Sequence, residues 1–155
     1  MKYKHGLIFG FAGIFLAAIF SFSACAKDDD DDPPAGKSLT VTGLGNYNGK
    51  YATATASSPM IFATASIDAS SSTITYVQIA DGKVTLPLWI VSESGISAYD
   101  GADTVSMQLM ITTERTATMG GGSNPTVIAM AGLENVNLGA SNPTVAVAAS
   151  DIVEP

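Results

Sequence analysis

Hydrophobic and polar residues alternate along most of the chain after residue 37, and the clearest alternation covers residues 104–112. Four apolar side chains there occupy every second position: Val105, Met107, Leu109 and Ile111. A period of two residues is typical of a β-strand with one face on a core and the other in water. No window of helical length shows an apolar period of 3.6 residues. The pattern therefore predicts an all-β domain.

Seven further runs have the same character and are separated by turn-forming compositions. About eight strands in 118 residues fit a two-layer antiparallel β-sandwich, with a small closed β-barrel as the alternative. The other runs cover residues 39–42, 51–56, 60–67, 73–79, 84–91, 126–131 and 143–149. The predicted core comprises Leu39, Val41, Ile74, Tyr76, Leu86, Leu88, Val105, Leu109, Ile111 and Val145.

Asp81-Gly82 lies directly between two of these runs and favours a type I′ turn, because glycine accepts the positive φ that this turn requires. We therefore expect residues 73–79 to pair with residues 84–91 as a hairpin. Pro87 lacks a backbone amide, so the second strand should be an edge, contain a bulge, or turn that position away from its neighbour.

The chain opens with a segment that does not fit the β pattern. Two lysines precede an uncharged apolar run over residues 6–22, and Ser23 and Ala24 then lead to Cys25, the only cysteine. This order is typical of a secretory signal. A short membrane-spanning helix and processing by an ordinary signal peptidase are the alternatives. Since Cys25 has no second cysteine to pair with, an internal disulfide is excluded.

Phe22-Ser23-Ala24-Cys25 resembles the lipobox of bacterial lipoproteins, with Phe22 where leucine is usual. The resemblance implies a diacylglyceryl thioether on the Cys25 sulfur, palmitate-like acyl chains, and cleavage between Ala24 and Cys25. Residues 1–24 would then be the signal peptide. Two or three acyl chains on one residue make a stable membrane anchor.

Residues 25–37 contain nothing to bury and repel themselves electrostatically, which is typical of a flexible tether. A segment of about twelve residues has a root-mean-square reach of about 20 Å. Its Lys-Asp-Asp core resembles the export signal that some bacteria place after the acylated cysteine, which implies the outer membrane or cell surface rather than the inner membrane. A solvated spacer is the alternative. The charged residues of this tether are Lys27, Asp28, Asp29, Asp30, Asp31 and Asp32.

Residues 38–155 form the predicted domain. Its opening, Leu39 to Leu44 followed by Tyr47-Asn48-Gly49-Lys50-Tyr51-Ala52, resembles that of small, mostly uncharacterised bacterial lipoproteins. The stretch from Gly82 to Trp89 is a second landmark of the same group. The resemblance implies a small β domain outside the cytoplasm and transfers no catalytic residue. The Gly-x-Tyr-x-Gly spacing of residues 45–49 also resembles that of lipocalins, which is an alternative, but the tryptophan typical of that family's first strand is missing.

The composition of the chain excludes several classes of function. The 155 residues carry a formal net charge of -7 and one arginine, Arg115, so the chain cannot neutralise a row of phosphates and nucleic-acid binding is excluded. The only histidine, His5, lies in the leader. The domain therefore lacks a Ser-His-Asp triad, a Cys-His pair and His or Cys zinc ligands. We expect no catalytic activity, no cofactor and no metal.

Two loops and four carboxylates remain as weaker candidates. Glu93, Asp100, Asp103 and Glu114 could supply an acid/base pair, but a domain this small seldom provides the cleft that such chemistry needs. Asp100-Gly101-Ala102-Asp103 could hold Ca²⁺, although a structural turn is the favoured interpretation. The glycine-rich residues 118–123 lack the ending of a phosphate-binding loop and indicate a hairpin loop.

Three aromatic residues are candidates for ligand contact, because their rings have apolar faces and polar tips. Ordinary packing is the favoured alternative for each. These residues are Tyr47, Trp89 and Tyr99. The sequence thus predicts a lipid-anchored binding or interaction module for a protein or carbohydrate ligand. A structural envelope lipoprotein without a specific ligand and a small barrel that carries an apolar ligand remain the alternatives.

Overall fold

The computed structural model describes residues 36–119 and 125–155, and the fold is all-β, as the sequence predicts. Two short 3-10 helices accompany the strands: η2 (Gly45–Tyr47) and η3 (Ala149–Asp151). The strands are β1 (Ser38–Thr42), β2 (Tyr51–Ser57), β3 (Met60–Ala63), β4 (Ser66–Asp68), β5 (Thr73–Thr75), β6 (Val77–Gln78), β7 (Lys83–Ser92), β8 (Gly95–Ala98), β9 (Thr104–Thr112), β10 (Thr116–Thr118), β11 (Val127–Asn137), β12 (Thr144–Ala146) and β13 (Ile152–Val153).

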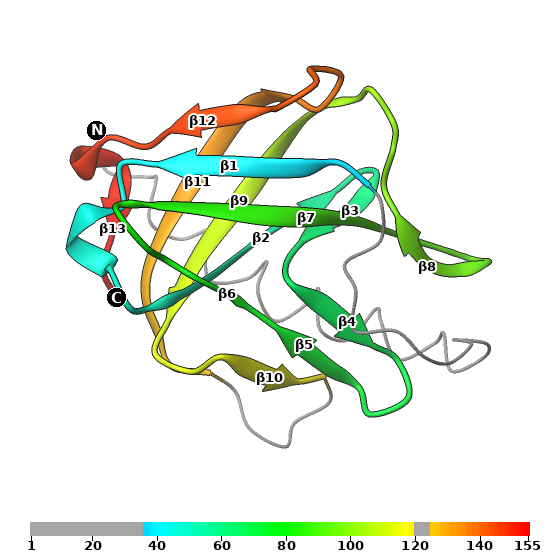
Figure 1. The fold of residues 1–155 in the computed structure, drawn as a ribbon, viewed down its shortest axis with the longest axis horizontal. Helices are drawn as coiled ribbons and strands as arrows, with labels where there is room; N and C mark the ends of the chain where they lie inside the picture. The colour runs from blue at the N-terminus through cyan, green and yellow to red at the C-terminus, as the bar shows by residue number, and fades with distance from the viewer. Residues whose placement is uncertain (1–35, 120–124) are drawn as a thin grey trace, which may run out of the picture.

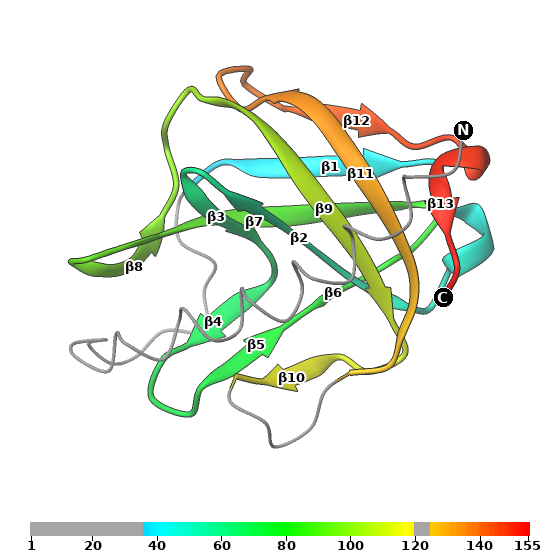
Figure 2. The same ribbon diagram turned by 180° about the vertical axis from the view of Figure 1, so that it is seen from behind.

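One large sheet provides both layers of the sandwich. Its strand order is β12-β1-β7-β3-β2-β9-β11-β13, with β6 added beside β2 and β8 beside β7. The sheet curls so that β12, β1 and β7 lie across β2, β9 and β11, as the two opposite views show (Figures 1 and 2). The order is linear, so in the described residues the sheet curls without closing into a barrel.

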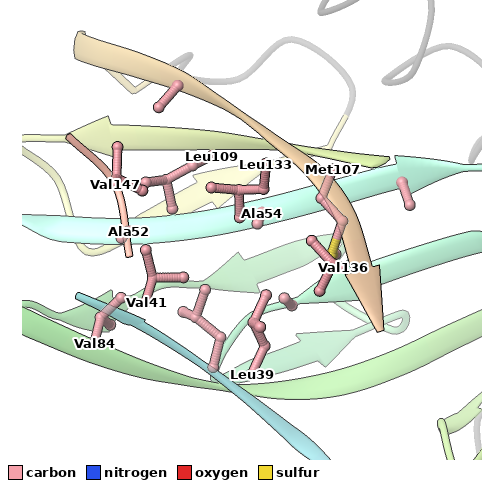
Figure 3. Close-up of a cluster of buried hydrophobic side chains, with 14 of the residues drawn as sticks. Leu39, Val41, Ala52, Ala54, Val84, Met107, Leu109, Leu133, Val136 and Val147 are labelled. Atoms are coloured by element: carbon pink, nitrogen blue, oxygen red, sulfur yellow. The ribbon is translucent and has the colours of Figure 1, made fainter. Parts of the chain in front are cut away.

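The main hydrophobic core fills the space between these two halves. Figure 3 shows Leu39, Val41 and Val84 on one side, facing Leu109 and Leu133 on the other. The face of β7 that contains Val84, Leu86 and Leu88 is buried, and so is the alternating face of β9. The predicted inward faces of both strands are therefore correct, because the period-two pattern records which face meets the core.

A small sheet, in the order β10-β5-β4, forms an additional layer outside the large sheet. It buries a second cluster, which comprises Phe62, Ile74, Tyr76, Val91, Ala117 and Met119, with Tyr51, Met60, Ile67, Trp89 and Ile96 partly buried against it. Ile74 and Tyr76 therefore belong to this second cluster, whereas the sequence placed them in one common core. Val145, also predicted as core, is only partly buried at the margin of the main cluster.

The predicted turn at Asp81-Gly82 is confirmed, but the predicted pairing of the two flanking strands is wrong. Asp81 and Gly82 have φ values of 53° and 69°, and Ala80 pairs with Lys83, which is the expected type I′ turn. The flanking strands then part, because β6 pairs with β2 and β7 pairs with β1 and β3. The turn is fixed by local chemistry, whereas strand pairing depends on partners far away in the sequence.

Several predicted runs also divide, and one pair of strands is not antiparallel. Residues 60–67 separate into β3 and β4, and residues 73–79 separate into β5 and β6, because each run changes from the main sheet to the small one or the reverse. Strand β12 pairs with β1 in parallel, so the sheet is mixed rather than purely antiparallel.

Pro87 lies inside the sheet, in agreement with the third of the predicted alternatives. It stands opposite Ser38 of β1, while the next residue, Leu88, donates its N–H to the Lys37 carbonyl at 2.9 Å. The Pro87 carbonyl points the other way and accepts the Thr64 N–H at 2.9 Å. Since the amide and carbonyl of a strand residue point to the same side, the missing amide removes no bond to β1.

Candidate functional site

Trp89 lies on the outer face of β7 and is half-buried in the second cluster. Its indole Nε1–H donates to the Thr64 carbonyl at 3.0 Å, so its polar tip already has a partner. Buried indole groups are usually satisfied in this way. In this structure, Trp89 joins the small sheet to the main sheet.

Tyr47 belongs to η2 and packs against the margin of the main cluster. Its hydroxyl donates to Glu154 Oε1 at 2.9 Å, which ties η2 to the C-terminal residues. Partial burial is the main cause that raises the pKa of Tyr47, and the Glu154 carboxylate adds to it. Of the three aromatic candidates, Tyr47 is the one whose tip lies at an exposed contact.

Tyr99 is a core residue with a relative exposure of 2%, so its ring does not offer a surface for a ligand. Its hydroxyl donates to Asp103 Oδ2 at 2.7 Å and accepts the Asp103 N–H at 3.0 Å. Burial, followed by the bond to Asp103, raises the pKa of Tyr99. A side chain on Gly101 would meet the ring, since an added Cβ would lie 2.6 Å from the Tyr99 hydroxyl. Residues 99–103 thus form a closed structural turn.

Lys37 occupies the junction of this turn with a second loop, and the sequence had assigned it to the tether. Its Nζ donates to the Gly101 carbonyl at 2.7 Å and to the Leu138 carbonyl at 2.9 Å. Its backbone N–H donates to the Tyr99 carbonyl at 3.3 Å. The Leu138 N–H in turn donates to the Asp103 carbonyl at 2.9 Å. The Gly101 carbonyl of this turn and the Leu138 carbonyl of the second loop are therefore both engaged by the Lys37 ammonium group.

Of the four carboxylates considered for acid/base chemistry, Asp100 and Asp103 share the turn at residues 99–103, whereas Glu93 and Glu114 lie in other connections. Asp103 immediately precedes β9 and Glu114 follows it, so a nine-residue strand of about 27 Å separates them. Glu114 is exposed, and hydrogen bonds from the Thr113 side chain and the Thr126 backbone lower its pKa. Asp100 is exposed within the turn at residues 99–103, and Glu93 lies in the turn between β7 and β8.

Asp68 has a strongly perturbed pKa, which is lowered to about 2. The cause is a set of four donors from the following turn: Ser70 Oγ at 2.6 Å, Ser71 Oγ at 2.6 Å, Ser70 N–H at 2.9 Å and Ser71 N–H at 3.3 Å. All four donors come from the turn that Asp68 begins, as in an Asx turn. The carboxylate therefore stabilises the β4–β5 connection.

Buried polar side chains in the described part of the chain are all threonines, and each has a partner. Thr53 donates to the Ala63 carbonyl at 3.0 Å, Thr64 to the Thr75 carbonyl at 2.6 Å, and Thr112 to the Glu114 carbonyl at 2.8 Å. Across residues 36–119 and 125–155, no buried side-chain nitrogen or oxygen lacks a hydrogen bond. These threonines satisfy backbone groups where strands end or change sheet.

Several sequence predictions lie outside the described residues, namely the lipobox, Cys25 and the charged tether from Lys27 to Asp32. Residues 120–124 of the glycine-rich loop are also outside, whereas Met119 is buried in the second cluster. In the part of the chain that the structure describes, no helix has the length and apolar character to cross a membrane. The same residues contain no group of three or more His, Cys, Asp or Glu side chains that could hold a metal ion.

The structure brings together Lys37, the Tyr99 turn and the loop at Leu138, and it separates Tyr47, Trp89 and Tyr99 into three environments. The Lys37 cluster was not predicted from the sequence, where the only indication was a lysine at the last position of the predicted tether. No protein-family model, curated protein or solved structure matches the chain.

Proposed function

We propose that the protein is a lipid-anchored extracytoplasmic protein whose β domain is a non-catalytic binding module on the outer membrane or cell surface. The observation that carries this proposal is the position of the only cysteine. Cys25 ends an apolar leader, and an acidic segment separates it from the β domain, which begins at Gly36–Lys37. The acyl chains on Cys25 bind membrane lipid, and the domain stands outside it.

The ionisable side chains support a binding role rather than catalysis. A catalytic acid and base need to face one substrate, but Asp103 and Glu114 are at opposite ends of β9. The two most perturbed groups, Asp68 and Tyr76, have structural causes for their pKa values in a turn and in a hydrophobic cluster. Perturbed groups at an active site would instead gather in one cleft.

The packed interior favours a surface contact over a carried ligand. Leu39, Leu109 and Leu133 are each no more than 1% exposed, and they meet between the two halves of the main sheet (Figure 3). A carrier of an apolar ligand would keep this space open. A protein or carbohydrate ligand on the outside is therefore the better proposal.

Protease accessibility on intact cells tests the anchoring and its side. We would compare the wild-type chain, Cys25→Ala, and a variant with Asp28 to Asp32 replaced by serine. The proposal expects cleavage of the wild type, loss of membrane association in Cys25→Ala, and protection of the serine variant. Protection of the wild type until the envelope is opened would contradict surface display, and mass spectrometry showing an unmodified Cys25 would contradict the lipid anchor.

A second experiment separates a binding module from a structural envelope component. The unlipidated Cys25→Ala chain is added to intact cells that lack the protein, and the bound amount is measured against concentration. A binding module gives saturable binding that unlabelled protein displaces. Binding that is absent, or that rises without saturation, would leave the structural role as the better account.

A further inference from the structure

The chain contains three places where an asparagine or aspartate stands directly before a glycine: Asn48-Gly49, Asp81-Gly82 and Asp100-Gly101. At such a pair the glycine nitrogen can attack the side-chain Cγ of the preceding residue and close a succinimide ring, because glycine has no Cβ that keeps the two groups apart. Two of the three pairs are aspartate-glycine and share the same chemistry. A difference in their reactivity in the folded domain therefore comes from the fold.

The fold occupies the nitrogen of the first two glycines. The Gly49 N–H donates to the Ile79 carbonyl at 2.9 Å, and the Gly82 N–H donates to Asn48 Oδ1 at 2.8 Å. A glycine nitrogen has to give up this proton and turn toward Cγ before the ring closes, so each hydrogen bond has to break first. The pairs at residues 48–49 and 81–82 are therefore protected in the folded domain.

The third pair has no such protection. Residues 36–119 and 125–155 contain no acceptor that forms a hydrogen bond with the Gly101 N–H, and no donor that binds the Asp100 carboxylate. The hydrogen bonds of this turn are made instead by the Gly101 carbonyl, which accepts from Lys37, and by Asp103, which binds the Tyr99 hydroxyl. Asp100 is also exposed, so water reaches its carboxyl group. Both reacting groups are therefore free of bonds to the domain.

Packing keeps a glycine at position 101. A Cβ added to Gly101 would lie 2.6 Å from the Tyr99 hydroxyl oxygen and 2.7 Å from Tyr99 Cζ. The Tyr99 side chain is buried and its hydroxyl is bonded to Asp103, so the ring cannot move aside without breaking these contacts. A larger residue at position 101 would slow ring closure but would displace Tyr99. The contacts that bury Tyr99 therefore also preserve the reactive pair.

We propose that Asp100 is a modification site, at which the backbone isomerises spontaneously to isoaspartate. The Gly101 nitrogen forms a bond to Asp100 Cγ, and the protonated carboxyl group loses water. Water then adds to the main-chain carbonyl carbon of Asp100 and breaks its bond to the Gly101 nitrogen. The products are a free α-carboxylate and a main chain that runs through Cγ. The water released in the first step is taken up in the second, so the reaction needs no oxidant, cofactor, lipid anchor or ligand.

The modified turn differs from the original in length. Isoaspartate adds one methylene group to the main chain between the Cα of residue 100 and the Gly101 nitrogen. The Gly101 carbonyl then moves relative to Lys37 Nζ, and the close packing of Gly101 on the Tyr99 ring is lost. Isomerisation therefore weakens the contacts that join Lys37 to the turn at residues 99–103.

Ageing of the purified full chain tests the site, with Asp81 as the internal control. The folded protein is incubated at neutral and at mildly acidic pH and is then digested with trypsin. Cleavage after Lys50, Lys83 and Arg115 places the two aspartate-glycine pairs in separate peptides. Isoaspartate in each peptide is measured by enzymatic methylation of its free α-carboxylate and is located by fragmentation in the mass spectrometer.

In the folded chain we expect isoaspartate at Asp100 to exceed that at Asp81 by about fivefold or more, which is the factor by which one ordinary hydrogen bond favours the closed state. In urea the two pairs should react at similar rates, because neither glycine nitrogen is then bonded. Similar rates in the folded chain, or a faster reaction at Asp81, would overturn the proposal. A difference that persists in urea would also overturn it, since the neighbouring residues rather than the fold would be the cause.

Asn48→Ala tests whether the hydrogen bond to the Gly82 N–H is the cause of protection. The variant removes the acceptor, so isoaspartate at Asp81 should rise about fivefold, toward the amount at Asp100. Asn137→Ala is the matched control, because Asn137 Oδ1 accepts a glycine N–H in another loop, and it should leave the rate at Asp81 unchanged. An unchanged rate at Asp81 in folded Asn48→Ala would contradict the protective role of the hydrogen bond. If Asn48→Ala does not fold, the comparison of the two pairs in the wild type decides.

Asp100→Glu identifies the reacting residue. Glutamate has one more methylene group, so ring closure with the Gly101 nitrogen is much slower, and isoaspartate should disappear from the peptide of residues 84–115. Asp103 lies in the same peptide but precedes Thr104 instead of a glycine, so it should stay unmodified. Isoaspartate that persists in this variant would place the reaction at Asp103 and overturn the assignment to Asp100.

Discussion

The two hydrophobic clusters of the domain differ in composition and in depth. The main cluster is largely aliphatic and lies between the two halves of the curled sheet, where residues such as Leu109 and Ile111 have an exposure of 0%. The second cluster is richer in aromatic rings and lies under the three-stranded sheet, where Ile74 is 7% exposed. The main cluster is enclosed by long strands, whereas the second is covered by strands of three residues.

This difference shows how a small β domain gains an additional outer layer. Strands β3 and β7 bury one face in the main cluster and present Phe62, Trp89 and Val91 to the second. A sheet with one face on a core normally exposes the other to water. The short sheet covers an outer face that would otherwise be an exposed aromatic patch. We expect the main cluster to determine the free energy of global unfolding. The second cluster should be able to lose its packing while the main cluster stays folded.

The largest effect should come from the main cluster. Ile111→Ala removes a fully buried side chain, and we expect a loss of about 4 kcal/mol in the free energy of unfolding. Urea denaturation followed by circular dichroism measures this loss as a lower midpoint at an unchanged m value. A loss below about 1 kcal/mol would mean that the core relaxes around the site or is less tightly packed than the burial indicates.

The next largest effect concerns alkaline pH and the second cluster. Burial, followed by the nearby Glu114 charge, raises the pKa of Tyr76 from 10.0 to about 12. The folded state therefore holds the phenol proton more tightly than the unfolded state. This contribution, about 3 kcal/mol, is fully present below pH 10 and is lost as the pH rises through 12.

Denaturation at a series of pH values from 9 to 12 measures this dependence for wild type and Tyr76→Phe. The free energy of unfolding should fall less steeply with pH in the variant. Some dependence should remain, because the pKa values of Tyr47 and Tyr99 are also raised. Parallel curves for both proteins would show that Tyr76 is accessible to water.

Ile74→Ala is the matched partner of Ile111→Ala, because the same atoms are removed from the second cluster. Ile74 is flanked by Ile67 on β4 and Ala117 on β10, and we expect a loss of about 2 kcal/mol. Trp89, the only tryptophan, lies in this cluster and reports on it by fluorescence. The fluorescence transition should precede the circular dichroism transition in Ile74→Ala, whereas the two should coincide in Ile111→Ala. Coincident transitions in both variants would contradict a locally responding second cluster.

Trp89→Phe should have the smallest effect of the four. It keeps most of the ring contact and removes the bond from Nε1 to the Thr64 carbonyl, which is worth about 1 kcal/mol. Chemical denaturation followed by circular dichroism gives the difference. A loss several times larger would show that the indole ring itself, rather than its hydrogen bond, joins the two sheets.

The parts of the fold that the sequence predicted are those with local causes. Alternation fixed the inward faces of β7 and β9, and the positive φ of Asp81 and Gly82 follows from the turn composition. Strands β8 and β10 were missed because four and three residues are too few to show an alternation. The parallel pairing of β1 with β12 and the separation of β6 from β7 depend on contacts between distant segments.

The residues of the candidate site were harder to predict for the same reason. Tyr99 directly precedes the turn composition Asp100-Gly101 and lies outside every predicted run, and its contacts with Asp103 and Gly101 are not revealed by composition. Lys37 follows an acidic, proline-containing stretch, and its partners are two carbonyl groups that any residue type could provide. Only the folded chain brings them together.

The place of β1 in the sheet has a mechanical consequence. The chain enters the domain at the start of β1, which is paired with β7 at five positions and with β12 at three. A pull on the chain before Ser38 that is opposed at the far end of β1 therefore acts along the strand axis, so that these ladders are sheared together instead of being unzipped one bond at a time. If the chain is held at Cys25, as we propose, and drawn outward by a ligand, it would resist extraction of its first strand, and its lifetime under tension would be set by the rate of that concerted rupture.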